Sequence, residues 1–142
     1  MVLRTDQFDK CLLTLEGALH QLGSHNQGTL EYDILLSAVI KNYELAVETA
    51  GKLVRKALKP YFGEPLHVAR LHYADVFREA VRFGLLDVEW VHRWLGYRNS
   101  RNRTAHDYGA DFAEALLPLM PAFLADCREL ADRLVLVFGS DE

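Results

Sequence analysis

Residues 97–108 hold the densest group of side chains in this sequence that could carry chemistry. Arg98, Arg101 and Arg103 follow one another there without an intervening Lys, Asp or Glu. Guanidinium groups bind phosphate and carboxylate oxygens through paired N–H donors. His106 adds an imidazole, which can accept or release a proton near neutral pH. The combination predicts a site that binds an anion and moves a proton.

The arginines also suit a purely structural role. An apolar segment with Trp90 and Trp94 leads into them and Gly109 follows them, which places them near the end of a helix. Arginines there complement the helix dipole and donate hydrogen bonds to free carbonyl groups. For Arg93 and the three arginines after it, phosphate binding and this structural role are equally compatible with the sequence. The presence of His106 favours the chemical interpretation.

Helix geometry limits how these side chains can meet. Asn99, Asn102 and His106 follow an i, i+3, i+7 spacing and share one face of a helix. Arg101 and His106 are separated by roughly 140° around a helix of 3.6 residues per turn. They converge if the helix unwinds near His106, or if a second copy of the chain supplies one of them. This favours a site at or near a two-fold dimer interface.

The rest of the sequence predicts helices that position this stretch. Apolar residues recur at spacings of three and four, and no strand-like alternation persists. Pro60 ends the longest pattern, and Pro118 and Pro121 bend or divide the last one. We therefore expect an all-α bundle of about five helices. The predicted helices cover 6–22, 30–59, 67–83, 87 into the arginine-rich stretch, and 110–138, with 61–66 as a connection.

Other side chains on these helices have simpler interpretations. Glu44, Glu48 and Lys52 fit a solvated face of the long second helix, where a Glu four residues before a Lys is a favourable pair. Trp90, Trp94 and Tyr97 have the spacing of a buried or interfacial helix face. In the helix that Asp87 begins, the residues expected to face inward are Val88, Val91, Trp94 and Leu95.

Length and composition predict one domain over residues 1–142. Half of the 142 residues are hydrophobic, which allows a substantial core. The net charge of −4 argues against a protein that coats nucleic acid, although a local basic site remains compatible with it. Cys11 and Cys127 form no Cys-x-x-Cys pair, which fits a reducing cytosol. With no signal core or membrane-length apolar run, we expect a cytoplasmic protein without a membrane partner.

Several classes of site are disfavoured by what the sequence lacks. The histidines form no His-Glu-x-x-His or comparable cluster, so we expect no metal site. The glycines are scattered at the ends of elements and form no phosphate-binding loop. There is no nucleophile elbow around a serine. The sequence thus predicts a site that needs no cofactor.

Three segments together resemble a known family. Residues 101–108 match Arg-x4-His-x-Tyr, with Asn directly after the Arg. Residues 43–52 are similar to an aromatic-Glu-x3-Glu-x3-Lys pattern, and 76–86 to a short helix that ends in Gly-Leu-Ile. This combination resembles the HEPN superfamily, in particular its HepT branch, once described as substrate-binding subunits of minimal nucleotidyltransferases. The resemblance covers a single HEPN-like helical domain whose core is about 6–134.

The resemblance implies an up-and-down helical bundle that dimerises and brings the Arg and His motifs together at the subunit interface. It also implies a metal-independent endoribonuclease. His106 would take the proton from a ribose 2′-hydroxyl or protonate the leaving oxygen, and Arg101 would stabilise charge on the phosphate. Asn102 would orient His106 or the RNA substrate, to which Arg98 and Arg103 would also bind. Tyr108 would lie at the rim of the cleft.

The same resemblance implies a partner. HepT toxins are held inactive by a minimal nucleotidyltransferase antitoxin of the MntA type, which transfers AMP to the motif tyrosine. Tyr108 is the matching position, and its AMPylation would place bulk and negative charge beside the arginines. The chain departs from the family at Ala46 and Gly51, where Thr and Trp are frequent. Two alternatives stay open: a non-catalytic subunit that binds substrate or nucleotide for a nucleotidyltransferase, and a purely structural helical dimer.

Overall fold

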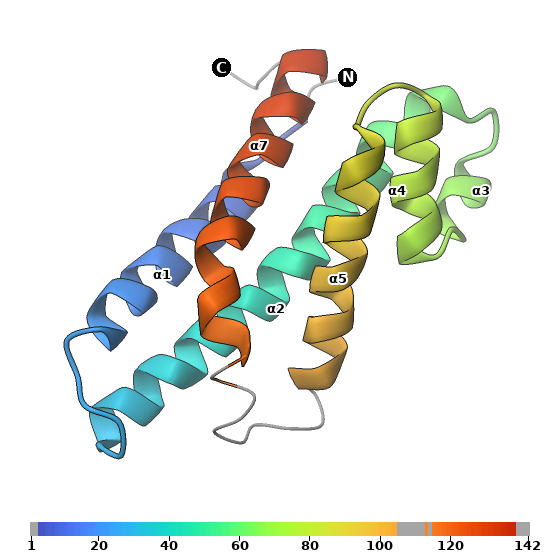
Figure 1. The fold of residues 1–142 in the computed structure, drawn as a ribbon. Helices are drawn as coiled ribbons and strands as arrows, with labels where there is room; N and C mark the ends of the chain where they lie inside the picture. Colours follow the sequence, from blue (N-terminus) through green and yellow to red (C-terminus); the bar gives the residue numbers. More distant parts are fainter. Residues whose placement is uncertain (1–2, 105–112, 114, 139–142) are drawn as a thin grey trace.

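The structure is a computed structural model that describes residues 3–104, 113 and 115–138. Its described residues form helices and their connections, with no strand among them, which confirms the all-α prediction. Figure 1 shows an up-and-down arrangement in which α1 and α2 run in opposite directions, as do α5 and α7. The helices are α1 (Asp6–Leu22), α2 (Leu30–Leu58), α3 (Pro65–Ala69), α4 (Tyr73–Arg82), α5 (Val88–Thr104) and α7 (Met120–Phe138), with 3-10 turns η1 (Lys59–Tyr61) and η2 (Leu117–Leu119).

The long helix α2 lies at the centre of the bundle. Its 29 residues span about 43 Å, and it contacts α1, α4, α5 and α7. Thr29 begins the helix, because its hydroxyl accepts a hydrogen bond from the backbone N–H of Tyr32 at 3.2 Å. Figure 1 shows α2 crossing the molecule behind α7 and α5. Its position allows one helix to carry both core residues and residues of a surface site.

An aromatic cluster joins α5 to the rest of the bundle. The ring of Trp94 is fully buried, with its centroid 5.6 Å from that of Phe77 on α4 and 5.9 Å from that of Phe123 on α7. Trp90 and Tyr97 are buried on the same helix, which confirms them as core residues. Val88 was expected to face inward but is 57% exposed, so that prediction is wrong. The inward face begins at Trp90, because the aromatic rings rather than the valines set the rotation of α5.

The predicted helix over 67–83 is divided, which raises the number of described α-helices to six. Pro65 begins α3 two residues before the predicted start, within the expected connection 61–66. The side chain of Arg55 on α2 donates to the carbonyl oxygens of Val68 at 2.8 Å and Ala69 at 3.2 Å. In a continuous helix those carbonyls would accept from backbone N–H groups four residues later. A tertiary contact therefore replaces the helical hydrogen bonds, and a new helix begins at Tyr73.

The remaining boundaries agree with the sequence within a residue or two. The first predicted helix is α1 with the same bounds. The second ends at Leu58, one residue early, because Pro60 lies in the 3-10 turn that follows. The last helix is divided at Pro118, as expected, by the turn η2 before α7 begins. Residues 110–112 of that predicted helix lie outside the described residues.

Candidate active site

The end of α5 presents two arginines and an asparagine beside α2. The Nη2 of Arg101 lies 2.5 Å from Oε1 of Glu48, which is 53 positions earlier in the chain. The Arg101 side chain is 26% exposed and that of Glu48 is 44% exposed. The guanidinium is thus anchored to the central helix, while part of the Arg101 side chain stays open to solvent. Glu48, expected on a merely solvated face, is instead the partner of the motif arginine.

Asn102 links the two arginines of this group. Its Oδ1 accepts from Nε of Arg98 at 3.3 Å and from Nη1 of Arg101 at 3.5 Å. Both guanidinium groups are therefore turned toward one amide oxygen on the surface of α5. Two planar cations so close together form a local positive site in an acidic protein. Such a site is suited to bind an oxyanion through several N–H donors.

The aromatic ring of Tyr73 packs against Arg98. The guanidinium carbon of Arg98 lies 4.8 Å from the centroid of the Tyr73 ring, a cation–π contact. The Tyr73 hydroxyl donates to the backbone carbonyl oxygen of Val47 at 3.1 Å, which ties the ring to α2. Burial raises the pKa of Tyr73 far above its ordinary value of 10.0, and the charge of Arg98 opposes this shift only in part. The hydroxyl therefore stays protonated and remains a donor.

Gly51 makes the approach of Tyr73 possible. A Cβ atom at residue 51 would lie 2.5 Å from Cε2 and 2.9 Å from Cδ2 of the Tyr73 ring. Real Cβ atoms do not come this close to other heavy atoms, so a side chain at this position would displace the ring. The departure from the family pattern at Gly51 thus has a physical reason. The missing side chain leaves room for the ring on which Arg98 rests.

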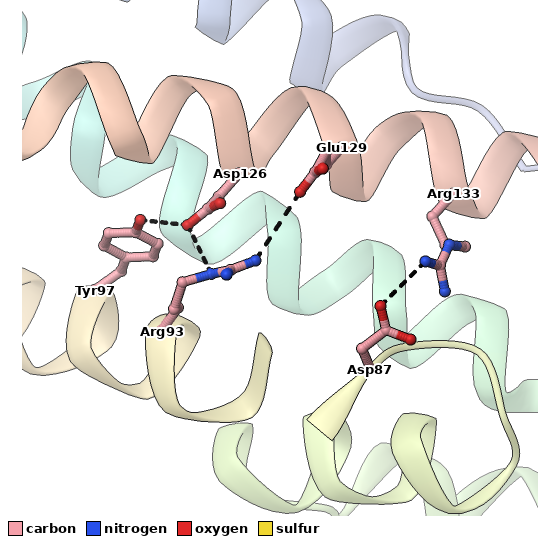
Figure 2. A network of polar contacts seen from close by, with 6 residues as sticks. All are labelled: Asp87, Arg93, Tyr97, Asp126, Glu129 and Arg133. Carbon is pink, nitrogen blue, oxygen red and sulfur yellow. Dashed lines mark hydrogen bonds and ion pairs between the residues drawn. The ribbon is translucent and has the colours of Figure 1, made fainter. Parts of the chain in front are cut away.

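The middle of α5 is held against α7 by a second polar group, shown in Figure 2. The Tyr97 hydroxyl donates to Oδ2 of Asp126 on α7 at 2.5 Å, and Nε of Arg93 lies 3.1 Å from the same oxygen. Arg93 also lies 3.9 Å from Glu129. Burial first, and then the hydrogen bond to Asp126, raise the pKa of Tyr97. Arg93 is therefore paired with carboxylates of α7, whereas Arg101 is paired with Glu48 of α2.

The predicted site residues fall into two groups. Arg98, Arg101 and Asn102 are brought together at the end of α5. His106 and Tyr108 lie outside the described residues, as does the side chain of Arg103, so their roles stay predictions. Sequence reasoning missed Tyr73, for which Gly51 was the available signal, and it underrated Glu48.

The described residues were also compared with the requirements of a metal site and of a membrane span. In this part of the chain, no group of three or more His, Cys, Asp or Glu side chains is arranged to hold a metal ion. No described helix has the length and apolar character needed to cross a membrane.

Comparison with family models matches residues 3–136 to the family described as "Nucleotidyltransferase substrate binding protein like". The chain belongs to this family. A curated relative from Haemophilus influenzae, named "Probable ribonuclease HepT", is 26% identical over 136 residues, covering 93% of this chain and 92% of the relative. The resemblance to the HepT branch is thereby confirmed.

A solved structure supports the same assignment of family and fold. The protein HI0074 from Haemophilus influenzae, described as having the fold of a substrate-binding domain of a nucleotidyltransferase, superposes with a TM-score of 0.78. The two chains are 26% identical, and the match covers 92% of this chain and 98% of HI0074. Relatives of this family therefore carry both a ribonuclease name and a substrate-binding description.

Proposed function

We propose that this HepT-like protein is a metal-independent endoribonuclease that acts as a toxin in the cytoplasm. One observation carries the proposal: Arg101, the first residue of the Arg-x4-His motif, is anchored by Glu48 yet keeps part of its side chain exposed. Arg98 and Asn102 lie beside it. The ribonuclease name of the curated relative supports the same activity. The substrate is RNA, whose phosphates match the charge of this surface.

The chemistry needs one base, one acid and a stabilised phosphate. His106 takes the proton from a ribose 2′-hydroxyl, and the 2′-oxygen attacks the adjacent phosphorus. The bond from phosphorus to the 5′-oxygen breaks, and that oxygen receives the proton from the imidazolium of His106, leaving a 2′,3′-cyclic phosphate. Arg101 donates to the oxygens on which negative charge increases. When a phosphate oxygen reaches Arg101, it accepts from N–H donors that now face Glu48. Arg98 and Arg103 bind the neighbouring phosphates of the RNA strand.

The active unit is a homodimer. Arg101 and His106 are about 140° apart on an ideal helix, so they do not meet on one straight helix. A second copy of the chain, related by a two-fold axis, brings an Arg101 and a His106 together. The partner antitoxin is a minimal nucleotidyltransferase of the MntA type. It transfers AMP from ATP to the Tyr108 oxygen, with pyrophosphate as the leaving group. The modified tyrosine blocks RNA entry by its bulk and its charge beside Arg101.

Controlled expression of the wild-type chain and of His106→Ala tests the activity. We expect growth arrest and cleaved cellular RNA only with the wild type. Purified wild-type protein should also cut RNA in excess chelator, because the proposed mechanism uses no metal. Folded wild-type protein that causes no arrest and leaves RNA intact, while a known nuclease of this family cuts it under the same conditions, would refute the proposal.

A second candidate function is a non-catalytic subunit that binds substrate or nucleotide for a nucleotidyltransferase. The description of the family model and of HI0074 favours it. It predicts that the His106→Ala variant binds the nucleotidyltransferase and its ligand as the wild type does, and that neither protein cuts RNA. A purely structural dimer predicts instead that Arg101→Ala lowers the melting temperature and changes no activity or binding.

A further inference from the structure

A cavity of about 370 Å³ lies between the start of α1 and the second half of α2, next to the Glu48–Arg101 pair but separate from it. Its lining includes Arg4 from the segment before α1, and Lys52 and Lys56 from α2. The hydroxyl-bearing Thr49 lines the same cavity, whereas Asp6 is the one carboxylate in the lining. The two lysines against the one carboxylate make a positive hollow in a chain whose net charge is −4.

The two lysines carry charge that the described protein does not neutralise. Glu48 stands four residues before Lys52, the favourable spacing for an ion pair on a helix, but its carboxylate binds Arg101 instead. Across the described ranges, neither Lys52 nor Lys56 has an ion pair. The two are also four residues apart, a spacing at which like charges repel. A bound anion would relieve this repulsion.

The start of α1 adds to the same surface. Thr5 occupies the N-cap position, but its side chain makes no capping hydrogen bond and its hydroxyl donates to Asp9 at 3.0 Å. The N-terminal end of a helix carries a partial positive charge. This end borders the cavity through residues 6–8. Because Asp6 and Asp9 in the first turn offset this charge, it is the lysines and Thr49 that favour an anionic ligand.

We propose that this cavity binds a phosphate group. Lys52 and Lys56 supply the charge, and the Thr49 hydroxyl donates to one oxygen. Along α2, Lys52 lies about 6 Å and Lys56 about 12 Å from Glu48, at 1.5 Å per residue. If the proposed ribonuclease function holds, on which this extension rests, a single RNA strand places one phosphate at Arg101 and a neighbouring one in the cavity. The cavity then fixes the direction and register of the strand across the cleavage site.

Two binding measurements test the site and identify the source of the phosphate. Calorimetric titration with pyrophosphate measures binding of a free phosphate compound, and the part of that binding lost with the two lysines of the cavity is the part that belongs to the cavity. Fluorescence anisotropy of a labelled single-stranded RNA probes the strand, in a His106→Ala background so that the probe is not cut. The test variant is Lys52→Ala with Lys56→Ala, and the control is Lys10→Ala, an exposed lysine of α1 outside the cavity lining. Alanine favours the helical state, so the test variant should fold.

We expect the test variant to weaken pyrophosphate binding and to raise the Kd for RNA about three- to tenfold at low salt. The slope of log K against log salt should fall by about 0.7, as for one lost phosphate contact to a single strand. Lys10→Ala should leave both nearly unchanged. If only pyrophosphate binding weakens, the cavity is a site for a free phosphate compound and its use by RNA is refuted. If neither probe responds, or Lys10→Ala has the same effect, the site itself is refuted, whether or not the protein cuts RNA.

Discussion

Replacement of Gly51 by Ala measures how tightly Tyr73 is held against α2. In a helix interior, Gly→Ala ordinarily stabilises by about 1 kcal/mol. Here the new Cβ would lie 2.5 Å from Cε2 of Tyr73, so the ring must move away from α2. That movement strains the hydrogen bond to Val47 at 3.1 Å and the contact with Arg98 at 4.8 Å. Overpacking of this kind costs about 1–3 kcal/mol, so we expect a net destabilisation of about 1 kcal/mol.

Urea unfolding followed by far-ultraviolet circular dichroism measures this free energy. Gly96→Ala is the matched control, because Gly96 is also within a helix and an added Cβ there meets nothing within 4 Å. We expect that control to stabilise by about 0.5–1 kcal/mol. In a Tyr73→Ala background the obstacle is gone, and Gly51→Ala should stabilise by a similar amount. The coupling between residues 51 and 73 is then about 2 kcal/mol.

The reasoning fails if Gly51→Ala stabilises the wild-type protein as much as Gly96→Ala does. It also fails if the effect of Gly51→Ala is the same with and without the Tyr73 ring. Either result would mean that the ring adjusts at no cost, and that the glycine does not define the position of Arg98.

Three further outcomes follow from the polar contacts of the bundle. Asp126→Ala should lower the free energy of unfolding by about 2 kcal/mol, because Asp126 is 12% exposed, accepts a hydrogen bond from Tyr97 and forms an ion pair with Arg93. Glu129 is 64% exposed and 3.9 Å from Arg93, so Glu129→Ala should cost under about 0.5 kcal/mol in the same urea titration. Glu48→Gln should change stability by less than about 1 kcal/mol, because its ion pair is partly exposed, and a loss above about 2 kcal/mol by thermal unfolding would contradict this. Burial raises the pKa of Tyr97 above that of the unfolded chain, so its contribution to the free energy of unfolding is complete below about pH 10 and is lost as the pH rises further. The midpoint of urea unfolding should therefore fall from pH 8 to pH 11, and it should fall less in Tyr97→Phe.

Helical periodicity was sufficient to predict most of the fold. The apolar spacings and the prolines located α1, α2, α5 and α7 because local propensity and burial agree there. The division between α3 and α4 was not predictable, since it depends on Arg55 reaching carbonyls 13 and 14 residues later. Val88 was misplaced for a related reason. A periodicity count weights a valine like a tryptophan, whereas the large rings determine which face of α5 is buried.

The sequence was sufficient to propose the residues of the candidate site, but it showed only part of how they are arranged. The arginine-rich stretch could be found because its residue types are concentrated in sequence. Its support could not, because Glu48 and Tyr73 come from other helices and neither stands out by type. The convergence of Arg101 with His106 stays a prediction.

The separation of Glu48 and Arg101 along the chain has a consequence for synthesis. The two residues are 53 positions apart, on helices that emerge from the ribosome at different times. The α1–α2 hairpin is complete before α5 exists, and in a nascent chain that ends before residue 101 Glu48 has no Arg101 to bind. Even the isolated 97–108 peptide would keep its arginines without the carboxylate that orients them. The defined orientation of the Arg101 guanidinium is therefore acquired only by the folded chain, late in its production.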